Sequence, residues 1–180
     1  PHGTDTFFER LIDLKDRMYQ NDRFQFQYSI HTTDVELRDR MIPVRKWSFE
    51  RMASYGERFH RAGDRKITLN FALAAGMPAD PAVLLRHFSP DRYLVKITPV
   101  NPTWHATKNG LASCVDPYDP ESGRSVAQAM ADAGYEVILS IGEVKENEIG
   151  SNCGQYVLKY LQEGEAVKDG YTYEVEQIAA

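Results

Sequence analysis

The sequence is poor in cysteine and lacks most of the motifs that identify a site without a structure. Its 180 residues include two cysteines, Cys114 and Cys153, which are far apart and do not make a disulfide framework. It contains no phosphate-binding glycine loop, no HExxH segment and no CxxC pair. The five histidines are scattered, which disfavours a metal site made by this chain alone.

Long apolar runs and an excess of positive charge are also missing. No apolar stretch is long enough to span a bilayer and no signal-peptide pattern is present, so we expect no membrane partner. The net charge is −5, so the overall electrostatics do not predict a nucleic-acid surface. We expect a cytoplasmic protein. The length suits one domain, and the first residue is Pro1 rather than methionine, so the chain can be a piece of a longer protein.

The most informative stretch is 23–44, which reads RFQFQYSIHTTDVELRDRMIPV. Its first half alternates apolar and polar residues, which predicts a β-strand over 23–31. The polar face ends in Ser29 and His31, which point the same way at the carboxyl end of the strand, where α/β proteins bind ligands. The alternative is a polar face that simply meets water. Asp34 or Thr33 can cap a short helix that Pro43 ends.

The rest of the chain alternates helical and strand patterns, which is typical of parallel β/α units. Thr6 and Glu9 form a capping-box pair at the start of the first helix. Gly63 is the expected C-cap of the second. The predicted helices are 6–19, 47–62, 80–88 and 124–133. The predicted strands are 66–73, 93–99, 136–141 and, at an edge, 171–175.

The three predicted strands with the clearest alternation indicate the fold class through the polarity of their two faces. Each has one apolar face and one partly polar face, whereas a fully packed parallel sheet is apolar on both. We therefore predict an α/β fold, an incomplete parallel β/α barrel whose inner wall lines a polar cavity. Ser29, His31 and Asn101 would lie on its rim. Residues 1–163 would form this portion, and 164–180 a C-terminal extension with an edge-like strand.

Two segments outside the regular elements are candidates for chemistry. The loop from about 101 to 123 is long enough to suggest a lid or a binding loop. Cys153 is bracketed by Gly150 and Gly154 among small polar residues, which favours an accessible thiol. A Cys–His hydrolase that uses Cys153 or Cys114 with His31 or His105 is left open.

Several short segments, in order along the chain, resemble one family. They are Ser29-Ile30-His31, the segment ELRDRMIPV at 36–44, VKITPVNP at 95–102 and NCGQY at 152–156. They are similar to SLH or SIH, ELRDELVPI, VNLIPFNP and ACGQL in the radical S-adenosylmethionine (SAM) methyltransferases that methylate adenine in 23S ribosomal RNA, and in their antibiotic-resistance relatives.

The resemblance implies a set of roles. Ser29, Ile30, His31 and Asn101 would contact SAM, and Cys153 would accept a methyl group from one SAM molecule. A second SAM, cleaved at a [4Fe-4S] cluster, would make that methyl reactive toward an aromatic carbon of RNA. An electrophilic ring carbon has no lone pair with which to attack a sulfonium, which is why such a methyl is carried on sulfur and made a radical.

The chain departs from that family in two ways. The cluster needs three thiolates at CxxxCxxC spacing, which two isolated cysteines cannot supply. We therefore expect the C-terminal part of such an enzyme, inactive alone, whose partner is the remainder of its own radical SAM domain. Residues 142–148 are acidic where RNA binding favours cations. The alternative is a catalytically silent α/β module that binds a small polar ligand at the same rim.

Overall fold

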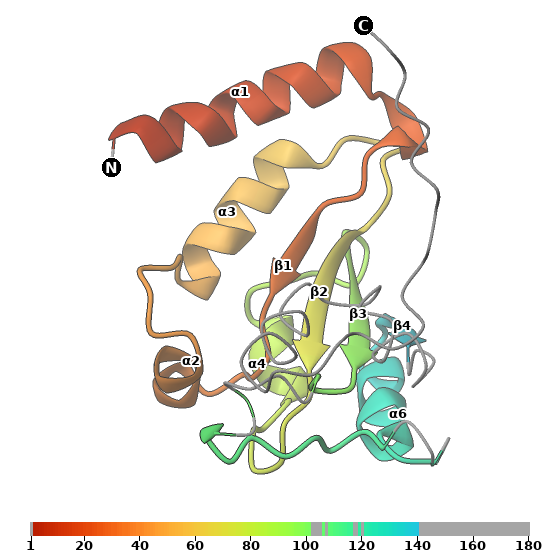
Figure 1. The fold of residues 1–180 in the computed structure, drawn as a ribbon. Helices are drawn as coiled ribbons and strands as arrows, with labels where there is room; N and C mark the ends of the chain where they lie inside the picture. The colour runs from red at the N-terminus through yellow and green to blue at the C-terminus, as the bar shows by residue number, and fades with distance from the viewer. Residues whose placement is uncertain (1, 102–105, 107, 117–118, 120, 141–180) are drawn as a thin grey trace, which may run out of the picture.

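Four parallel strands and the helices between them make up the part of the chain that the computed structural model describes, which is 2–101, 106, 108–116, 119 and 121–140. The strands lie in chain order in one sheet (Figure 1). They are β1 (Gln27–Ser29), β2 (Ile67–Ala72), β3 (Tyr93–Thr98) and β4 (Glu136–Leu139). The helices are α1 (His2–Met18), the 3-10 turn η1 (Asn21–Arg23), α2 (Val35–Met41), α3 (Phe49–Phe59), α4 (Pro81–Leu85) and α6 (Arg124–Asp132).

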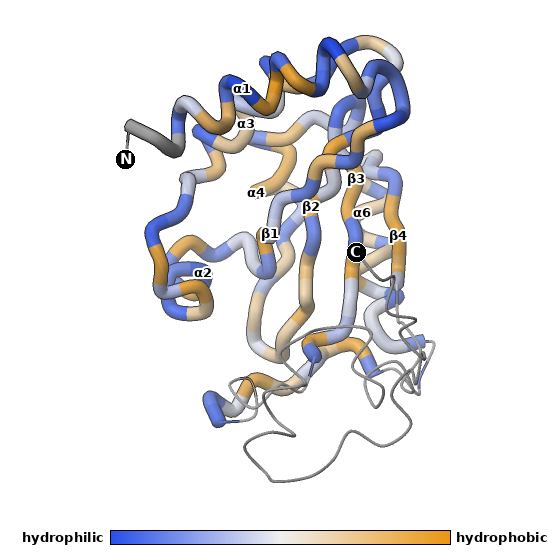
Figure 2. The backbone as a smooth tube through the Cα atoms, turned by 45° about the horizontal axis from the view of Figure 1, so that its top comes forward, coloured by the Kyte–Doolittle hydropathy of each residue, from blue (hydrophilic) through white to orange (hydrophobic). Residues whose placement is uncertain are grey.

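The two faces of the sheet differ in polarity. Tyr28, Leu69 and Val95 are in register on one face and are buried against α3, α4 and α6, which lie on that side (Figure 2). Side chains alternate between the two faces along each strand. The residues directly before and after Tyr28, Leu69 and Val95 therefore point to the opposite, more open face. The predicted α/β class and the parallel sheet are confirmed, and so is the split between an apolar and a partly polar face. Closure into a barrel stays a prediction.

The core is built on the predicted apolar stripe of α3. Phe49, Met52, Tyr55 and Phe59 recur at helical spacing and are all buried. Ser48 caps the helix by accepting a hydrogen bond from the Arg51 N–H. The helix approaches β3 closely at Gly56, since a Cβ built there would lie 1.9 Å from the Tyr93 hydroxyl oxygen.

Several predicted boundaries were wrong. Helix α1 begins at His2, so Thr6 lies inside it and is not its N-cap. Strand β1 begins at Gln27 instead of residue 23, although Phe24 and Phe26 still pack on the core. Helix α3 ends at Phe59, and Gly63 lies beyond its C-cap, His60.

Strand β4 also differs from its prediction, because Glu136 and Ile138 are exposed where two apolar faces were expected. The predicted strand 171–175 lies outside the described residues. No helix in the described ranges combines the length and hydrophobicity needed to cross a membrane.

Candidate functional site

The carboxyl end of β1 is positioned by backbone hydrogen bonds to β2. The Ile30 and His31 N–H groups both donate to the carbonyl of Asn70, at 2.9 and 3.3 Å. Ser29 is in register with Asn70, so its hydroxyl belongs to the open face, where it is exposed. Ile30 points the other way and is fully buried in the core. Ile30 therefore has only its backbone carbonyl to offer a ligand.

His31 turns the chain out of the strand. Its φ of 65° lies in the left-handed region, which costs a residue other than glycine about 1 kcal/mol and persists only where surrounding contacts offset that cost. A long-range hydrogen bond does so, because the imidazole Nδ1 accepts from the Ala72 backbone N–H at 3.1 Å. The acceptor nitrogen carries no proton, so the neutral ring bears its proton on Nε2. The imidazole is thereby fixed across the carboxyl end of β2 with one N–H free to donate.

Two features keep this imidazole neutral. Burial lowers the pKa of His31, and the positive charge of Arg38 lowers it further. Both act against the protonated form, which would also lose the hydrogen bond from Ala72. The site therefore presents a hydrogen-bond donor at Nε2 without a positive charge on the ring.

The loops that follow β1 and β2 are tied together at the same edge. The hydroxyls of Thr32 and Thr33 both donate to the Pro78 carbonyl, at 2.8 and 3.1 Å. The Asp80 N–H donates to the Thr33 hydroxyl at 2.9 Å. Asp34 then caps α2 by accepting from the Leu37 N–H, as its sequence position predicted. These contacts restrict the backbone that directly follows His31.

Arg38, the third residue of the ELRDRMIPV segment, is a residue whose role the sequence did not reveal. Its side chain is buried, and its guanidinium donates to the carbonyls of Trp47 at 3.1 Å and Ser29 at 3.3 Å. It also lies 5.3 Å from the centre of the Phe49 ring. Arg38 therefore joins α2, the end of β1 and the start of α3 directly behind the candidate site.

Asn101 follows β3 by three residues and is half-buried. It lies at the same carboxyl edge as Ser29 and His31 but beyond β2, and its side chain forms no hydrogen bond with either of them. The neighbouring Val100 N–H donates to the Ser113 hydroxyl at 2.9 Å, and Ser113 bridges to Ala74. The edge therefore brings Ser29 and His31 together and places Asn101 farther along it.

Of the two cysteines, the structure describes Cys114 and not Cys153. Cys114 is exposed in the loop after β3, where its N–H donates to the Leu73 carbonyl at 2.8 Å. Cys153, predicted to carry a methyl group, lies outside the described residues, as does His105. Within the described ranges no cluster of three or more His, Cys, Asp or Glu side chains could hold a metal. The sequence has two cysteines, whereas a [4Fe-4S] cluster of the radical SAM type takes three thiolate ligands, so the residues present do not fit such a cluster.

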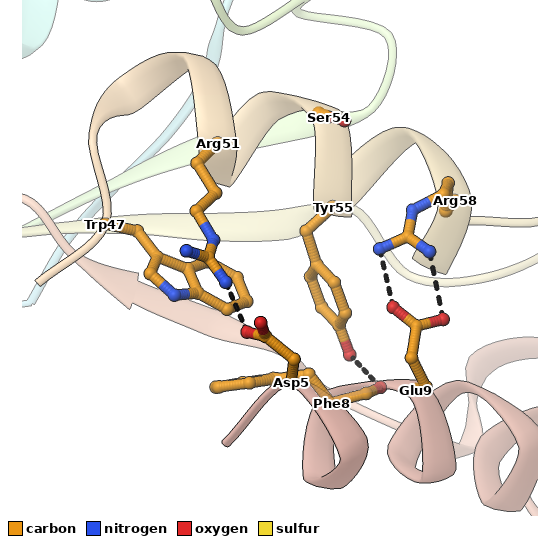
Figure 3. Close-up of a pocket in the computed structure, with 8 residues that line it drawn as sticks. All are labelled: Asp5, Phe8, Glu9, Trp47, Arg51, Ser54, Tyr55 and Arg58. Atoms are coloured by element: carbon orange, nitrogen blue, oxygen red, sulfur yellow. Dashed lines mark hydrogen bonds and ion pairs between the residues drawn. The ribbon is translucent and has the colours of Figure 1, made fainter. Parts of the chain in front are cut away.

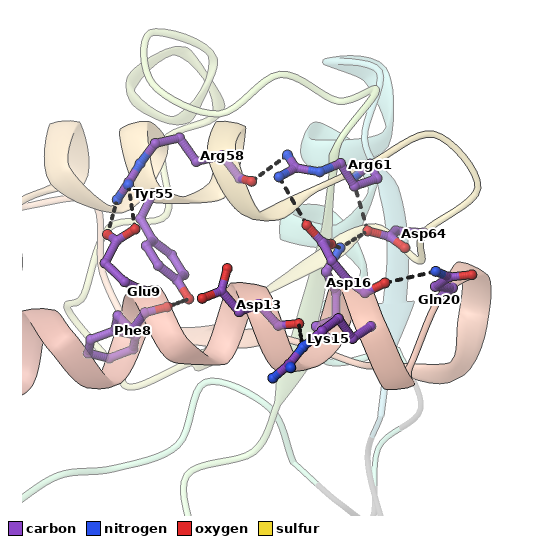
Figure 4. A network of polar contacts seen from close by, with 11 residues as sticks. Phe8, Glu9, Asp13, Lys15, Asp16, Gln20, Tyr55, Arg58, Arg61 and Asp64 are labelled. Atoms are coloured by element: carbon purple, nitrogen blue, oxygen red, sulfur yellow. Dashed lines mark hydrogen bonds and ion pairs between the residues drawn. The ribbon is translucent and has the colours of Figure 1, made fainter.

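Two cavities lie away from this edge, between α1 and α3. The larger, about 330 Å³, has an aromatic wall of Trp47 and Tyr55 (Figure 3). Its charges are already paired, Arg58 with Glu9 at 2.8 Å and Arg51 with Asp5. A second cavity of about 240 Å³ lies beside a polar network of residues from α1 and from the end of α3 onward (Figure 4), which includes Lys15, Asp16, Gln20, Arg61 and Asp64.

This network is structural in character. Lys15 is almost fully buried and forms ion pairs with Asp64 at 2.5 Å and Asp16 at 2.7 Å. Burial on its own would raise the pKa of Asp16. The hydrogen bonds and positive charges of Lys15 and Arg61 outweigh this effect, so the pKa of Asp16 is lowered. The network clamps α1 to the turn after α3. We therefore place the candidate site at the strand ends and not in the larger cavity.

Comparisons with known proteins agree with the fold. No family model matches the chain, and no curated protein sequence matches it. Its structure is similar to the crystal structure of a radical SAM methyltransferase from Sphaerobacter thermophilus, with 18% sequence identity and a TM-score of 0.55. The match covers 83% of this chain and 41% of that protein, so the chain spans less than half its length. At this identity the likeness shows a shared fold.

Proposed function

We propose that this chain carries the SAM-binding edge of a radical SAM methyltransferase-type domain, in which its four strands belong to an incomplete parallel β/α barrel. The fold likeness supports the architecture. The observation that carries the assignment to SAM is the immobilised His31, whose Nδ1 is held by the Ala72 N–H beside the exposed Ser29 hydroxyl. In the family that the sequence resembles, the matching serine and histidine contact SAM.

The polar groups at the edge suit such a ligand. Ser29 offers a hydroxyl, His31 an N–H from a neutral ring, and Asn101 a side-chain amide. The adenosyl and methionyl parts of SAM carry hydroxyl, ring-nitrogen and carboxylate acceptors for these donors. In this proposal Ser29 and His31, at the end of β1 and just beyond it, orient SAM, and Asn101 contacts it from the segment that follows β3.

Cys153 would act as the methyl acceptor. Its thiolate attacks the SAM methyl carbon, a new S–C bond forms as the sulfonium–methyl bond breaks, and S-adenosylhomocysteine leaves. The thiol proton passes to solvent. Further transfer to a carbon acceptor requires the cluster-bearing remainder of the domain as partner. If that acceptor is RNA, the remainder also has to supply cations, because this chain has a net charge of −5.

Binding of S-adenosylhomocysteine tests the first part. His31→Asn keeps a residue that tolerates the left-handed backbone and can accept from Ala72, but removes the Nε2–H. We expect about a tenfold loss of affinity by calorimetry, the effect of one hydrogen bond. His60→Asn, at the C-cap of α3, is the matched control and should bind as the parent does. Equal affinity of the parent and His31→Asn would contradict the role of His31.

Methyl transfer separates the enzyme from the silent binding module. After incubation with methyl-labelled SAM, mass spectrometry of digested protein should find the label on Cys153 and not on Cys114. Cys114→Ala should keep the labelling, and Cys153→Ala should abolish it. Binding of the cofactor without label on either cysteine would favour the silent module.

A further inference from the structure

Three polar side chains form a row across the open face of the sheet. Ser29 on β1 is in register with Asn70 on β2, and Asn70 is in register with Lys96 on β3. Residues paired in this way point to the same side of the sheet. Neighbouring strands are about 4.8 Å apart, so the row spans roughly 10 Å from its first to its last Cα atom.

Lys96, at one end of the row, has no anionic partner among the described residues. Its side chain is half-buried and forms no ion pair or hydrogen bond with them. The acidic residue on the same face of the neighbouring strand, Glu136, is in register with Leu94 and pairs with Lys66 at 3.7 Å. Ser29 and Asn70 also lack side-chain hydrogen bonds within the described part of the chain.

A second cation lies at the other end of the row. The buried Arg38 guanidinium donates to the Ser29 carbonyl and forms no ion pair with any described residue. Its Nε atom is buried without a hydrogen-bond partner there, and the adjacent Asp39 pairs with Lys46. The row therefore has a cation near each end, Lys96 and Arg38, and the charge of Asp39 partly offsets that of Arg38. The chain as a whole has a net charge of −5.

Lys96 lies at a position where a charged ammonium group does not contribute to the stability of the sheet. Strand β3 lies between β2 and β4, and lysine is depleted in strands, above all where its charge is partly withdrawn from water.

We propose that Lys96, with Asn70 and Ser29, binds an anionic group, a carboxylate or a phosphate, of a ligand that lies on the open face. This deepens the proposed function, on which it rests for the face involved, by stating the charge that the site accepts. The anion has two possible sources, the methionyl carboxylate of SAM or an acidic group of the methyl acceptor.

Three probes distinguish these sources. S-adenosylhomocysteine carries the carboxylate, 5′-methylthioadenosine lacks it, and inorganic diphosphate presents an anion without the adenosyl group. We expect Lys96→Gln to weaken at least one anionic probe about tenfold or more in calorimetry, and Lys96→Arg to restore most of the affinity. Lys66→Gln, on the same face, is the matched control and should bind as the parent does.

The pattern of losses identifies the source. A loss for S-adenosylhomocysteine but not for 5′-methylthioadenosine assigns the anion to the cofactor. A loss for diphosphate alone assigns it to a separate acceptor. Equal binding of all three probes by the parent and Lys96→Gln overturns the proposal, as does a parent that binds none of them. Lys96→Met replaces the glutamine variant if that variant unfolds at a lower temperature than the parent.

The two proposals fail independently. If the parent binds diphosphate through Lys96 but neither adenosyl compound, the anion site stands and the proposed function is wrong. If S-adenosylhomocysteine binds in a manner that depends on His31 but not on Lys96, the proposed function stands and the anion site is wrong.

Discussion

His31 Nδ1 and the Ala72 backbone N–H form a 3.1 Å hydrogen bond that links the end of β1 to the end of β2. The bond requires an unprotonated Nδ1, so it couples the protonation of His31 to the folded state. Burial and the charge of Arg38 lower the pKa of His31, so the unfolded chain binds this proton more readily. The contribution of His31 to stability is therefore fully present above the unfolded pKa of about 6.5, and it is lost as the pH falls from there through the lower folded pKa.

This relationship gives a prediction about pH. Urea unfolding should show that the parent loses more stability than His31→Asn between pH 7.5 and 5.5, because asparagine does not titrate. The pKa of His60 is also lowered, with burial as the main cause, so His60→Asn is the necessary comparison. If the pH dependence of stability remains in His31→Asn and disappears in His60→Asn, His60 causes it and the prediction for His31 is wrong.

Arg38 should be necessary for stability. Its replacement by alanine leaves the Trp47 and Ser29 carbonyls without their donor, and we expect a loss of roughly 2–4 kcal/mol in the free energy of unfolding. Arg40→Ala, on the exposed side of the same helix, should change stability by less than about 0.5 kcal/mol. Equal effects of the two variants in urea titrations would show that the buried contacts of Arg38 contribute little.

Gly56→Ala tests the close approach of α3 to β3. The added methyl would overlap the Tyr93 hydroxyl, so we expect destabilisation of about 1–3 kcal/mol by thermal or urea unfolding. Tyr93→Phe removes the hydroxyl and should rescue part of the loss in the double variant. Ser54→Ala, exposed on the same helix, serves as the control. Strictly additive effects of Gly56→Ala and Tyr93→Phe would rule out this contact as the cause.

The ion pairs between α1 and the region around α3 should differ sharply in how much each contributes to the free energy of unfolding. Lys15→Ala removes the ion-pair partner of the nearly buried Asp64 carboxylate and leaves it only the Arg61 N–H, so a loss of roughly 3–5 kcal/mol is expected. Glu9→Gln breaks an exposed pair with Arg58, which contributes at most about 1 kcal/mol. Chemical unfolding of both variants at low and high salt measures the difference. A larger loss of stability for Glu9→Gln than for Lys15→Ala would show that the buried network around Lys15 is not what holds α1 in place.

Much of the fold could be predicted because hydrophobic periodicity reports burial. The stripe from Phe49 to Phe59 and the strands near 67–72 and 93–98 follow directly from it. The burial of Lys15 and Arg38 does not, because a charged residue in a helical pattern is typical of a solvent-exposed face. Their partners are distant in the sequence, and only the packed structure brings them together.

The candidate site was predictable to a similar extent. Alternation in β1 placed Ser29 on the polar face, and the order of parallel units placed Asn101 at the same edge. The left-handed backbone of His31 and its bond to Ala72 depend on the pairing of β1 with β2, which no local pattern indicates. The row that ends at Lys96 likewise required the register across three strands.

The outer side of β1 determines where a further strand could extend the sheet. The Phe26 carbonyl and the Ile30 N–H bond to β2, so the backbone groups of Gln27 and Ser29 face away from the sheet. An exposed strand edge is a template for intermolecular pairing and aggregation. Here the Arg38 guanidinium donates to the Ser29 carbonyl, so this last outward-facing acceptor of β1 is already occupied. A strand that continues the sheet on this side therefore has to take its hydrogen bonds from β1 upstream of the Ser29 carbonyl.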